Sequence, residues 1–292
     1  MKKRLGRLLL GAVFCGMLAM TGCGSDGAAA ENISAEQVAE YLQKAQQMLE
    51  EADSFTADFR AETQMRDEAA AITAGIVTMV KEPLFMVVDT DLQFEDMSQE
   101  YDLYLEETED AVNQYMNYDG QWTEMTRTEA DALTSVQIYN TLYNLETILA
   151  AAENWTAMED DKELKLTGII PEEKFYDVEE YTRWFQLAGM SGLSEVYYAG
   201  VGDVPVTVWL DEKTGAPLSY EVELAKPLEI MTNNVLRELS GGEIENGAEV
   251  KCYTITSELT QLGNVEAGEI PAEAKSDAIN YEKEISMLES AE

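Results

Sequence analysis

The side chains that could carry out chemistry in this chain are few in kind. Its 292 residues contain no histidine, three cysteines, and 57 aspartates and glutamates. Histidine is the commonest general base, metal ligand and pH-sensitive group, so the usual versions of these roles are missing. Cys15 and Cys23 lie near the N-terminus, and Cys252 stands alone. We therefore expect no disulfide framework and no thiolate metal site, and we interpret Cys252 as a small buried residue in a strand.

The acidic residues give no specific catalytic or metal-binding signal. Asp89 and Asp91, followed by Glu95 and Asp96, have a faint similarity to a calcium loop, but Phe94 stands where an EF-hand requires glycine. Strand alternation places Asp89 and Asp91 on a solvent face, which favours an ordinary solvated surface. Paired carboxylates for glycoside hydrolysis carry no weight, because 57 acids make coincidental pairs inevitable. No nucleophile elbow or phosphate loop is present, so we expect no enzyme and no cofactor.

Cys23 is the residue with the clearest chemistry, because the segment before it has the three parts of an export signal. Lys2 to Arg7 is basic, and Leu8 to Met20 is an apolar run too short to remain as a membrane span. The run leads into Leu18-Ala19-Met20-Thr21-Gly22-Cys23. This segment resembles the lipobox of bacterial lipoproteins, although Met20 stands where leucine is usual.

The lipobox resemblance implies that diacylglyceryl is transferred to the Cys23 sulfur and that the chain is cleaved between Gly22 and Cys23. An ordinary secretory signal and a permanent membrane helix are the alternatives. Two or three acyl chains would anchor the protein stably, since each buried CH₂ contributes about 0.8 kcal/mol. We expect a signal peptide over 1–22 and a lipidated cysteine with a flexible tether over 23–33. The protein would then sit at the cell membrane, lipid-anchored on the extracytoplasmic face.

The charge of the chain excludes one class of partner. Lys and Arg number 19 against 57 Asp and Glu, a formal net charge of −38, and four of the basic residues lie in the first seven positions. Without those four, the remaining 15 basic and 57 acidic residues give a formal charge of −42. Such a body is repelled by nucleic acid and by anionic lipid headgroups. Nucleic-acid binding is excluded, and the membrane contact is left to the acyl chains.

Residues 55–126 have the pattern of a run of β-strands. In Phe55–Glu62 apolar and polar residues alternate strictly, which places Phe55, Ala57, Phe59 and Ala61 on one sheet face. The Asp119-Gly120 pair is a typical hairpin turn. Further strands are expected over 71–80, 84–92, 98–107, 112–118 and 121–125.

The rest of the chain alternates helical periodicity with hairpins. Apolar residues recur at helical spacing over 34–53, where Ser34 and Gln37 fit a capping box, over 128–154, and over 171–188. Hairpins are expected over 155–170 and 204–224, a helix over 228–239 and a last strand over 248–262. No internal repeat or proline-rich linker is present. We expect one domain over 34–275 and an acidic C-terminal tail over 276–292.

Three segments carry a resemblance to a known family: Tyr118–Trp122, Val208–Gly215 and Ile270–Ala274. With the element order and the lipobox, they resemble the LolA/LolB-like superfamily, which includes the mycobacterial glycolipid-binding LppX/LprG lipoproteins. Uncharacterised Gram-positive lipoproteins of that superfamily are more similar still. The resemblance covers about 34–275. It implies an α+β fold with a strongly curved, half-open antiparallel β-sheet, an incomplete barrel, whose helices pack on the concave side.

The resemblance also implies an apolar cavity for acyl chains, as in characterised members, and no catalytic residue. Parity places Tyr101 and Tyr104 on opposite faces of one strand, and Tyr115 and Tyr118 likewise. The same inward residues would form a plain core if the helices fill the concave side completely. The candidate cavity lining is Phe55, Phe59, Met86, Val88, Tyr101, Leu103, Trp122, Leu142, Leu145, Trp184, Val206 and Val208.

Two functions follow from these observations. The first is a membrane-anchored extracytoplasmic lipoprotein, monomeric, that binds or carries a lipid or lipid-linked molecule in a cavity between sheet and helices. The second is a non-catalytic interaction or envelope-stress lipoprotein with a solid core and no ligand, whose protein partner is unknown. An enzyme would require convergent carboxylates of raised pKa in a cleft.

Overall fold

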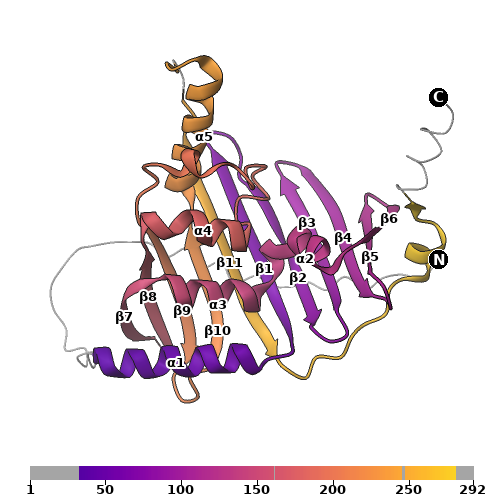
Figure 1. The fold of residues 1–292 in the computed structure, drawn as a ribbon, viewed down its shortest axis with the longest axis horizontal. Coiled ribbons are helices and arrows are strands. Elements are labelled where there is room, and N and C mark those ends of the chain that lie inside the picture. Colours follow the sequence, from indigo (N-terminus) through magenta and orange to yellow (C-terminus); the bar gives the residue numbers. More distant parts are fainter. Residues whose placement is uncertain (1–32, 161, 245–246, 281–292) are drawn as a thin grey trace. The chain divides into compact units, whose positions relative to one another are not determined.

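The computed structural model of this chain describes residues 33–160, 162–244 and 247–280 (Figure 1). The predicted signal peptide, Cys23 and nearly all of the predicted tether lie outside the described residues, as does most of the C-terminal tail. The described residues belong to one compact unit. Their elements form a single sheet with most of the helices against one of its faces.

The described part of the chain contains twelve strands, most of them where the alternation predicts them. The strands are β1 (Ser54–Met65), β2 (Ala71–Val80), β3 (Phe85–Phe94), β4 (Met97–Glu107), β5 (Val112–Tyr118), β6 (Gln121–Arg127), β7 (Glu153–Asp160), β8 (Glu163–Ile170), β9 (Val204–Asp211), β10 (Pro217–Glu223), β11 (Val250–Leu262) and β12 (Ile279–Asn280). The helices are α1 (Ala35–Glu51), α2 (Glu129–Val136), α3 (Thr141–Ala151), α4 (Glu172–Thr182), α5 (Ala225–Ser240) and α6 (Ala272–Ser276), with 3₁₀ segments η1 (Gln137–Tyr139) and η2 (Glu195–Tyr198).

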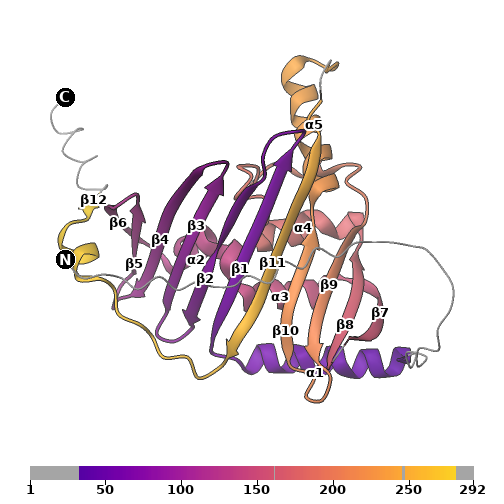
Figure 2. The same cartoon turned by 180° about the vertical axis from the view of Figure 1, so that it is seen from behind.

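The sheet consists of two arms that meet at the pairing of β1 with β11. Its strand order is β12-β6-β5-β4-β3-β2-β1-β11-β10-β9-β8-β7, and every pair is antiparallel except β12 with β6. We call β1–β6 with β12 the meander arm and β7–β11 the return arm. Figures 1 and 2 show the arms extending to opposite ends of the sheet.

The predicted α+β class with a largely antiparallel sheet is confirmed, but the predicted strong curvature is wrong. The sheet is neither closed nor strongly curled, and β7 and β12 remain at its two ends. Strong curvature requires bulges and glycine kinks. The ladders that join β2 to β6 contain no register shift. The meander arm is therefore too regular to close into an incomplete barrel.

The alternation predicted for Phe55–Glu62 is confirmed and defines the two faces of the sheet. Phe55, Ala57, Phe59 and Ala61 are buried on the side where the helices pack, which we call the helix face. Asp58 and Arg60 are exposed on the opposite side, the outer face.

The helices lie across the helix face because the chain has to cross it. β6 and β7 are consecutive strands at opposite ends of the sheet, so the connection α2–η1–α3 spans both arms. The predicted single helical stretch over 128–154 is broken between η1 and α3. Asn140 has a non-helical backbone there, and its side-chain oxygen accepts the Tyr143 N–H at 3.2 Å as the N-cap of α3. The predicted capping box of α1, by contrast, is present at Ser34 and Gln37.

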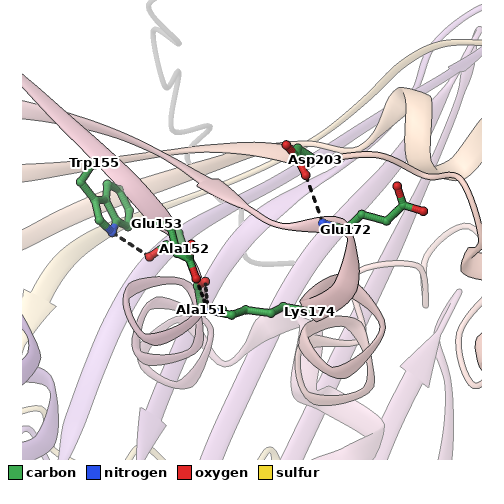
Figure 3. A network of polar contacts seen from close by, with 7 residues as sticks. All are labelled: Ala151, Ala152, Glu153, Trp155, Glu172, Lys174 and Asp203. Atoms are coloured by element: carbon green, nitrogen blue, oxygen red, sulfur yellow. Dashed lines mark hydrogen bonds and ion pairs between the residues drawn. The ribbon is translucent and has the colours of Figure 1, made fainter.

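Figure 3 shows how α3 and α4 are fixed to each other over the return arm. Lys174 of α4 donates to the Ala151 carbonyl at the end of α3 at 3.2 Å, and to Glu153 at 2.7 Å. The Trp155 indole donates to the Ala152 carbonyl at 3.0 Å, and an Asp203 oxygen accepts the Glu172 N–H at 3.2 Å. The last carbonyls of α3 and the first N–H of α4 thus have partners.

The helix predicted over 171–188 ends early. Arg183 has a φ of +55°, the left-handed conformation that terminates α4. Trp184 and Phe185 lie in the turns that follow and are fully buried. They point into the core because the chain turns back onto the sheet at this position.

After β11 the chain runs back past the strand ends of the meander arm to α6 and β12 (Figure 2). Val265 N–H donates to the Ser54 hydroxyl at 3.0 Å, and Lys275 pairs with Glu106 at 2.8 Å. Tyr115, an outer-face residue of β5, is buried there.

Candidate functional site

Most of the predicted cavity-lining residues lie in one continuous hydrophobic core. Their side chains pack with those of the helices: the rings of Phe59 and Tyr139 are 4.9 Å apart edge-on, and the ring of Phe175 is 6.5 Å from that of Trp184 and 6.0 Å from that of Phe185. The buried members are Phe55, Phe59, Met86, Val88, Leu103, Leu142, Leu145, Trp184, Val206 and Val208.

The remaining two predicted lining residues have different places. Tyr101 lies half-buried on the helix face, where burial raises the pKa of its hydroxyl to about 12. Trp122 lies on the outer face, because the two-residue turn at Asp119-Gly120 pairs Tyr118 with Gln121 and so places Trp122 opposite Asn117. Its ring is 5.8 Å from that of Tyr104. The structure therefore does not bring Trp122 together with the other eleven.

A group of polar side chains is buried under α4. The Tyr198 hydroxyl donates to Glu179 at 2.7 Å, the Tyr253 hydroxyl donates to the Trp184 carbonyl, and Asn144 Nδ2 donates to the Tyr220 hydroxyl at 3.2 Å. Burial raises the pKa of Glu179, partly offset by the Tyr198 hydrogen bond. These contacts give the Tyr198, Tyr253 and Asn144 donors acceptors within the core and hold the turn after α4 in place.

The carboxyl groups of raised pKa do not converge on one cleft. Burial is the largest cause for Asp89 on β3, Glu146 on α3, Glu179 on α4 and Glu221 on β10. Asp89 and Glu221 lie on the outer face, whereas Glu179 is in the core. Among the described residues, no group of three or more His, Cys, Asp or Glu could hold a metal ion. In the same residues, no helix is long and apolar enough to span a membrane.

One feature of the described residues that can receive a ligand is a cleft of about 550 Å³ on the helix face of the meander arm. It lies between the β2–β3 turn and α2. Figure 1 shows α2 over this arm, whereas α1, α3 and α4 lie mainly over the return arm. The cleft is lined by Met79, Lys81, Glu82, Pro83, Leu84, Glu107, Glu129, Leu133 and Asn140.

The inner surface of the cleft is apolar and held by the backbone. Met79 and Leu84 are buried, and Leu133 of α2 is half-buried opposite them. Leu84 N–H donates to the Glu107 carboxylate at 2.6 Å, and Glu107 N–H donates to the Leu84 carbonyl at 2.9 Å. These two bonds fix the β2–β3 turn to the end of β4, so the inner wall is preformed.

The charges around the cleft are mostly negative. Glu82, Glu107 and Glu129 are exposed carboxylates, and Lys81 is the cation among the lining residues. Lys81 also acts on Glu146 of α3: burial raises the pKa of that carboxyl, and the nearby ammonium opposes the rise. An anionic headgroup in the cleft would be repelled by three carboxylates, and the one cation, Lys81, also interacts with Glu146. The charge of the cleft therefore disfavours an anionic ligand.

Comparison with known proteins gives a structural likeness. No protein-family model matches the chain, and no curated protein sequence matches it. The structure is similar to that of LprF from Mycobacterium bovis, with a TM-score of 0.43 and 10% identity, over 82% of this chain and 98% of that one. It is also similar to a LolA superfamily protein from Nitrosomonas europaea, with a TM-score of 0.21 and 8% identity, over 80% of this chain and 94% of that one. Both similarities are at low sequence identity, and no property of either protein is transferred to this chain by them.

Sequence reasoning named none of the cleft residues as a site. The gap between the strands expected over 71–80 and 84–92 indicates a turn at Lys81–Pro83, and Leu133 falls within the helical stretch expected over 128–154. Asn140 before a helical run is a recognisable N-cap signal, and it could have located the start of α3. No local signal places α2 above the β2–β3 turn, because that contact joins segments about 50 residues apart.

Proposed function

We propose that this chain is a membrane-anchored extracytoplasmic lipoprotein that binds or carries an apolar ligand, a lipid or lipid-linked molecule, in the cleft between α2 and the β2–β3 turn. The observation that carries the proposal is the cleft itself, about 550 Å³ with an apolar inner wall. Clefts that bind small molecules typically measure about 300–1,000 Å³. Four of the nine residues that line this cleft are apolar, and the other five are polar or charged.

The chemistry of the lining favours an amphiphile. Met79, Leu84 and Leu133 offer an apolar surface, and methionine adapts its shape to flexible chains. The polar end of the ligand would lie among Glu82, Glu107 and Glu129. We therefore expect an uncharged or cationic headgroup on an apolar chain.

Ligand binding can be tested with residues 24–292, which contain every described element. We expect native mass spectrometry to detect co-purified lipid, and the protein to take up a fluorescent monoacylglycerol, an uncharged probe. Leu133→Trp should fill the cleft from α2 and abolish uptake. Leu239→Trp, which adds the same ring at an exposed position of α5, should leave uptake unchanged. Absence of lipid and of uptake in the wild-type protein would contradict lipid binding, and equal uptake by the two variants would contradict the cleft as the site.

Membrane anchoring is a separate part of the proposal and rests on the lipobox resemblance at Cys23. Cys23→Ala should release the protein from membranes or leave its leader uncleaved. Fractionation with mass measurement of the N-terminus checks this. A cleaved form of the variant that still sediments with membranes would refute lipidation at Cys23.

A second candidate is the non-catalytic interaction or envelope-stress lipoprotein. The observation in its favour is that ten of the predicted lining residues are packed in a continuous core. On this alternative the cleft is a surface depression, and no amphiphile should raise the thermal unfolding midpoint of residues 24–292. A midpoint that rises with probe concentration would favour the lipid carrier.

A further inference from the structure

Asn140 is a nearly buried residue that lines the cleft, with 8% of its surface exposed. Three of its polar groups are used by the fold. Its N–H donates to the Gln137 carbonyl at 3.0 Å, and its carbonyl accepts the Asn144 N–H at 2.9 Å. Its side-chain oxygen accepts the Tyr143 N–H at 3.2 Å.

The capping bond fixes which way the Asn140 amide points. Only the oxygen of an amide accepts, so Oδ1 must face the Tyr143 N–H, and the NH₂ group takes the other side. Among the described residues, none accepts a hydrogen bond from that NH₂. The nitrogen itself is still accessible, so it is available to an acceptor that enters the cleft.

Asn144, one helical turn later, provides the contrast. Its Nδ2 donates to the Ile138 carbonyl at 3.0 Å and to the Tyr220 hydroxyl at 3.2 Å, both inside the core. The fold thus satisfies the amide donor of the asparagine that faces the core. It leaves open the donor of the asparagine that lines the cleft.

We infer that the NH₂ group of Asn140 binds an acyl carbonyl oxygen of the ligand, an ester or amide at the junction of the apolar chain and its headgroup. This inference rests on the proposed function and names the chemistry that the cleft recognises. An acceptor is required because the open group is a donor. A neutral carbonyl fits better than a carboxylate or phosphate, because Glu82, Glu107 and Glu129 would repel an anion. In such a ligand the carbonyl group is next to the apolar chain. In the cleft, Asn140 is likewise next to the apolar wall, so both contacts can form at once.

The test uses two uncharged probes with the same chain, below their micelle concentrations: monododecanoyl glycerol, an ester, and 1-O-dodecyl glycerol, the corresponding ether. We expect residues 24–292 to bind the ester about fivefold more tightly than the ether, the usual worth of one neutral hydrogen bond. Asn140→Asp keeps the shape and the capping oxygen but removes the donor. It should lower ester affinity to that of the ether and leave ether affinity unchanged.

Asn140→Ser controls for the added charge, since serine also caps a helix but is neutral and too short to reach the ligand. It should lose the ester preference in the same way, with an unfolding midpoint close to that of the wild type. If the wild type prefers neither probe, or if both variants weaken the two probes alike, the carbonyl contact is overturned and the lipid carrier stands. If neither probe binds the wild type, the proposed function fails and the inference fails with it.

Discussion

The two arms of one sheet differ in what covers their helix face. In the return arm, alternate residues of β8 and β9 are fully buried beneath α3 and α4. In the meander arm, Leu92, Met97 (65% exposed) and Tyr118 (57% exposed) stand on the same face and remain open. Alternation therefore tells which face a side chain is on. Whether that face becomes a solid core depends on how many helices reach it.

The arms also differ in how their helices are held. Lys174 of α4 bonds to the end of α3, Trp155 bonds to the residue after α3, and Asp203 bonds to the first residue of α4 (Figure 3). α2 is capped by Thr128 and tied at its other end by Gln186, which donates to the Ser135 carbonyl at 2.8 Å. The return arm thus has an interlocked helix pair, and the meander arm has one short helix beside a cleft.

The largest expected effect tests this difference with two matched leucines. Leu145 of α3 is fully buried over the return arm, and Leu133 of α2 is half-buried beside the cleft. Leu145→Ala should lower the free energy of unfolding by about 2–5 kcal/mol, because it leaves a cavity. Leu133→Ala should cost about 1 kcal/mol. Urea denaturation measures both, and equal losses would mean that the two arms are packed alike.

Gly75 marks a close approach between two strands of the meander arm. It lies between Phe59 of β1 and Thr90 of β3, and a Cβ at this position would come within 2.0 Å of the Asp89 carbonyl oxygen. Since backbone would have to shift, Gly75→Ala should destabilise by about 1–3 kcal/mol. Ala74→Ser, on the opposite face, should change the unfolding free energy by less than about 0.5 kcal/mol. A Gly75→Ala protein as stable as the wild type would show that the strands of the meander arm can shift at little cost in free energy.

Glu179 should make the return arm sensitive to pH. Burial raises the pKa of this carboxyl above its ordinary 4.5, so the folded state holds the proton to a higher pH than the unfolded state. Stability should therefore fall as pH rises from about 4.5 through the folded pKa. Glu179→Gln stays neutral and keeps an oxygen for the Tyr198 hydroxyl, so its stability relative to wild type should increase over that range. Urea unfolding of both proteins from pH 4 to 8 measures the difference in their free energies of unfolding. A difference that does not change with pH would contradict the raised pKa of Glu179.

The smallest effect concerns the ion pairs. Lys174 pairs with Glu153 and also caps the Ala151 carbonyl, whereas Lys275 pairs with Glu106 on the outer face of the meander arm. Both pairs are largely solvent-exposed and worth at most about 1 kcal/mol. Lys174→Ala should cost more than Lys275→Ala, because it also removes a helix cap. Thermal unfolding at low and high salt separates the ion pair from the helix cap. Salt weakens the attraction between Lys174 and Glu153 more than it weakens the hydrogen bond to the Ala151 carbonyl.

The local elements of this fold were largely predictable, because their causes are local. Alternation located β1 to β6, and Ser34 with Gln37 located the start of α1. The end of α4 was missed because Arg183 adopts a left-handed conformation with no glycine to announce it. The predicted curvature came from the family resemblance, and the regular ladders of the meander arm did not follow it.

The candidate site was less predictable. Trp122 was assigned to the wrong side of its strand, although the Asp119-Gly120 turn fixes the register that places it outside. The cleft depends on α2 meeting the β2–β3 turn, a tertiary contact that no periodicity encodes. The open donor on Asn140 depends on the partners of its other polar groups, and those partners are set by the three-dimensional structure.

The pairing of β1 with β11 has a consequence for how the chain acquires its fold. Other antiparallel neighbours in the sheet are consecutive strands, whereas this ladder joins Phe55 to Leu262, about 200 residues later. Contacts of low sequence separation form fast, and those of high contact order form slowly. Closing so long a loop costs little additional free energy, since each doubling of loop length costs about 0.6 kcal/mol. It does, however, slow the formation of the β1–β11 ladder. We expect each arm to form independently from its local strand pairs. The pairing of β1 with β11 should then form last and limit the folding rate.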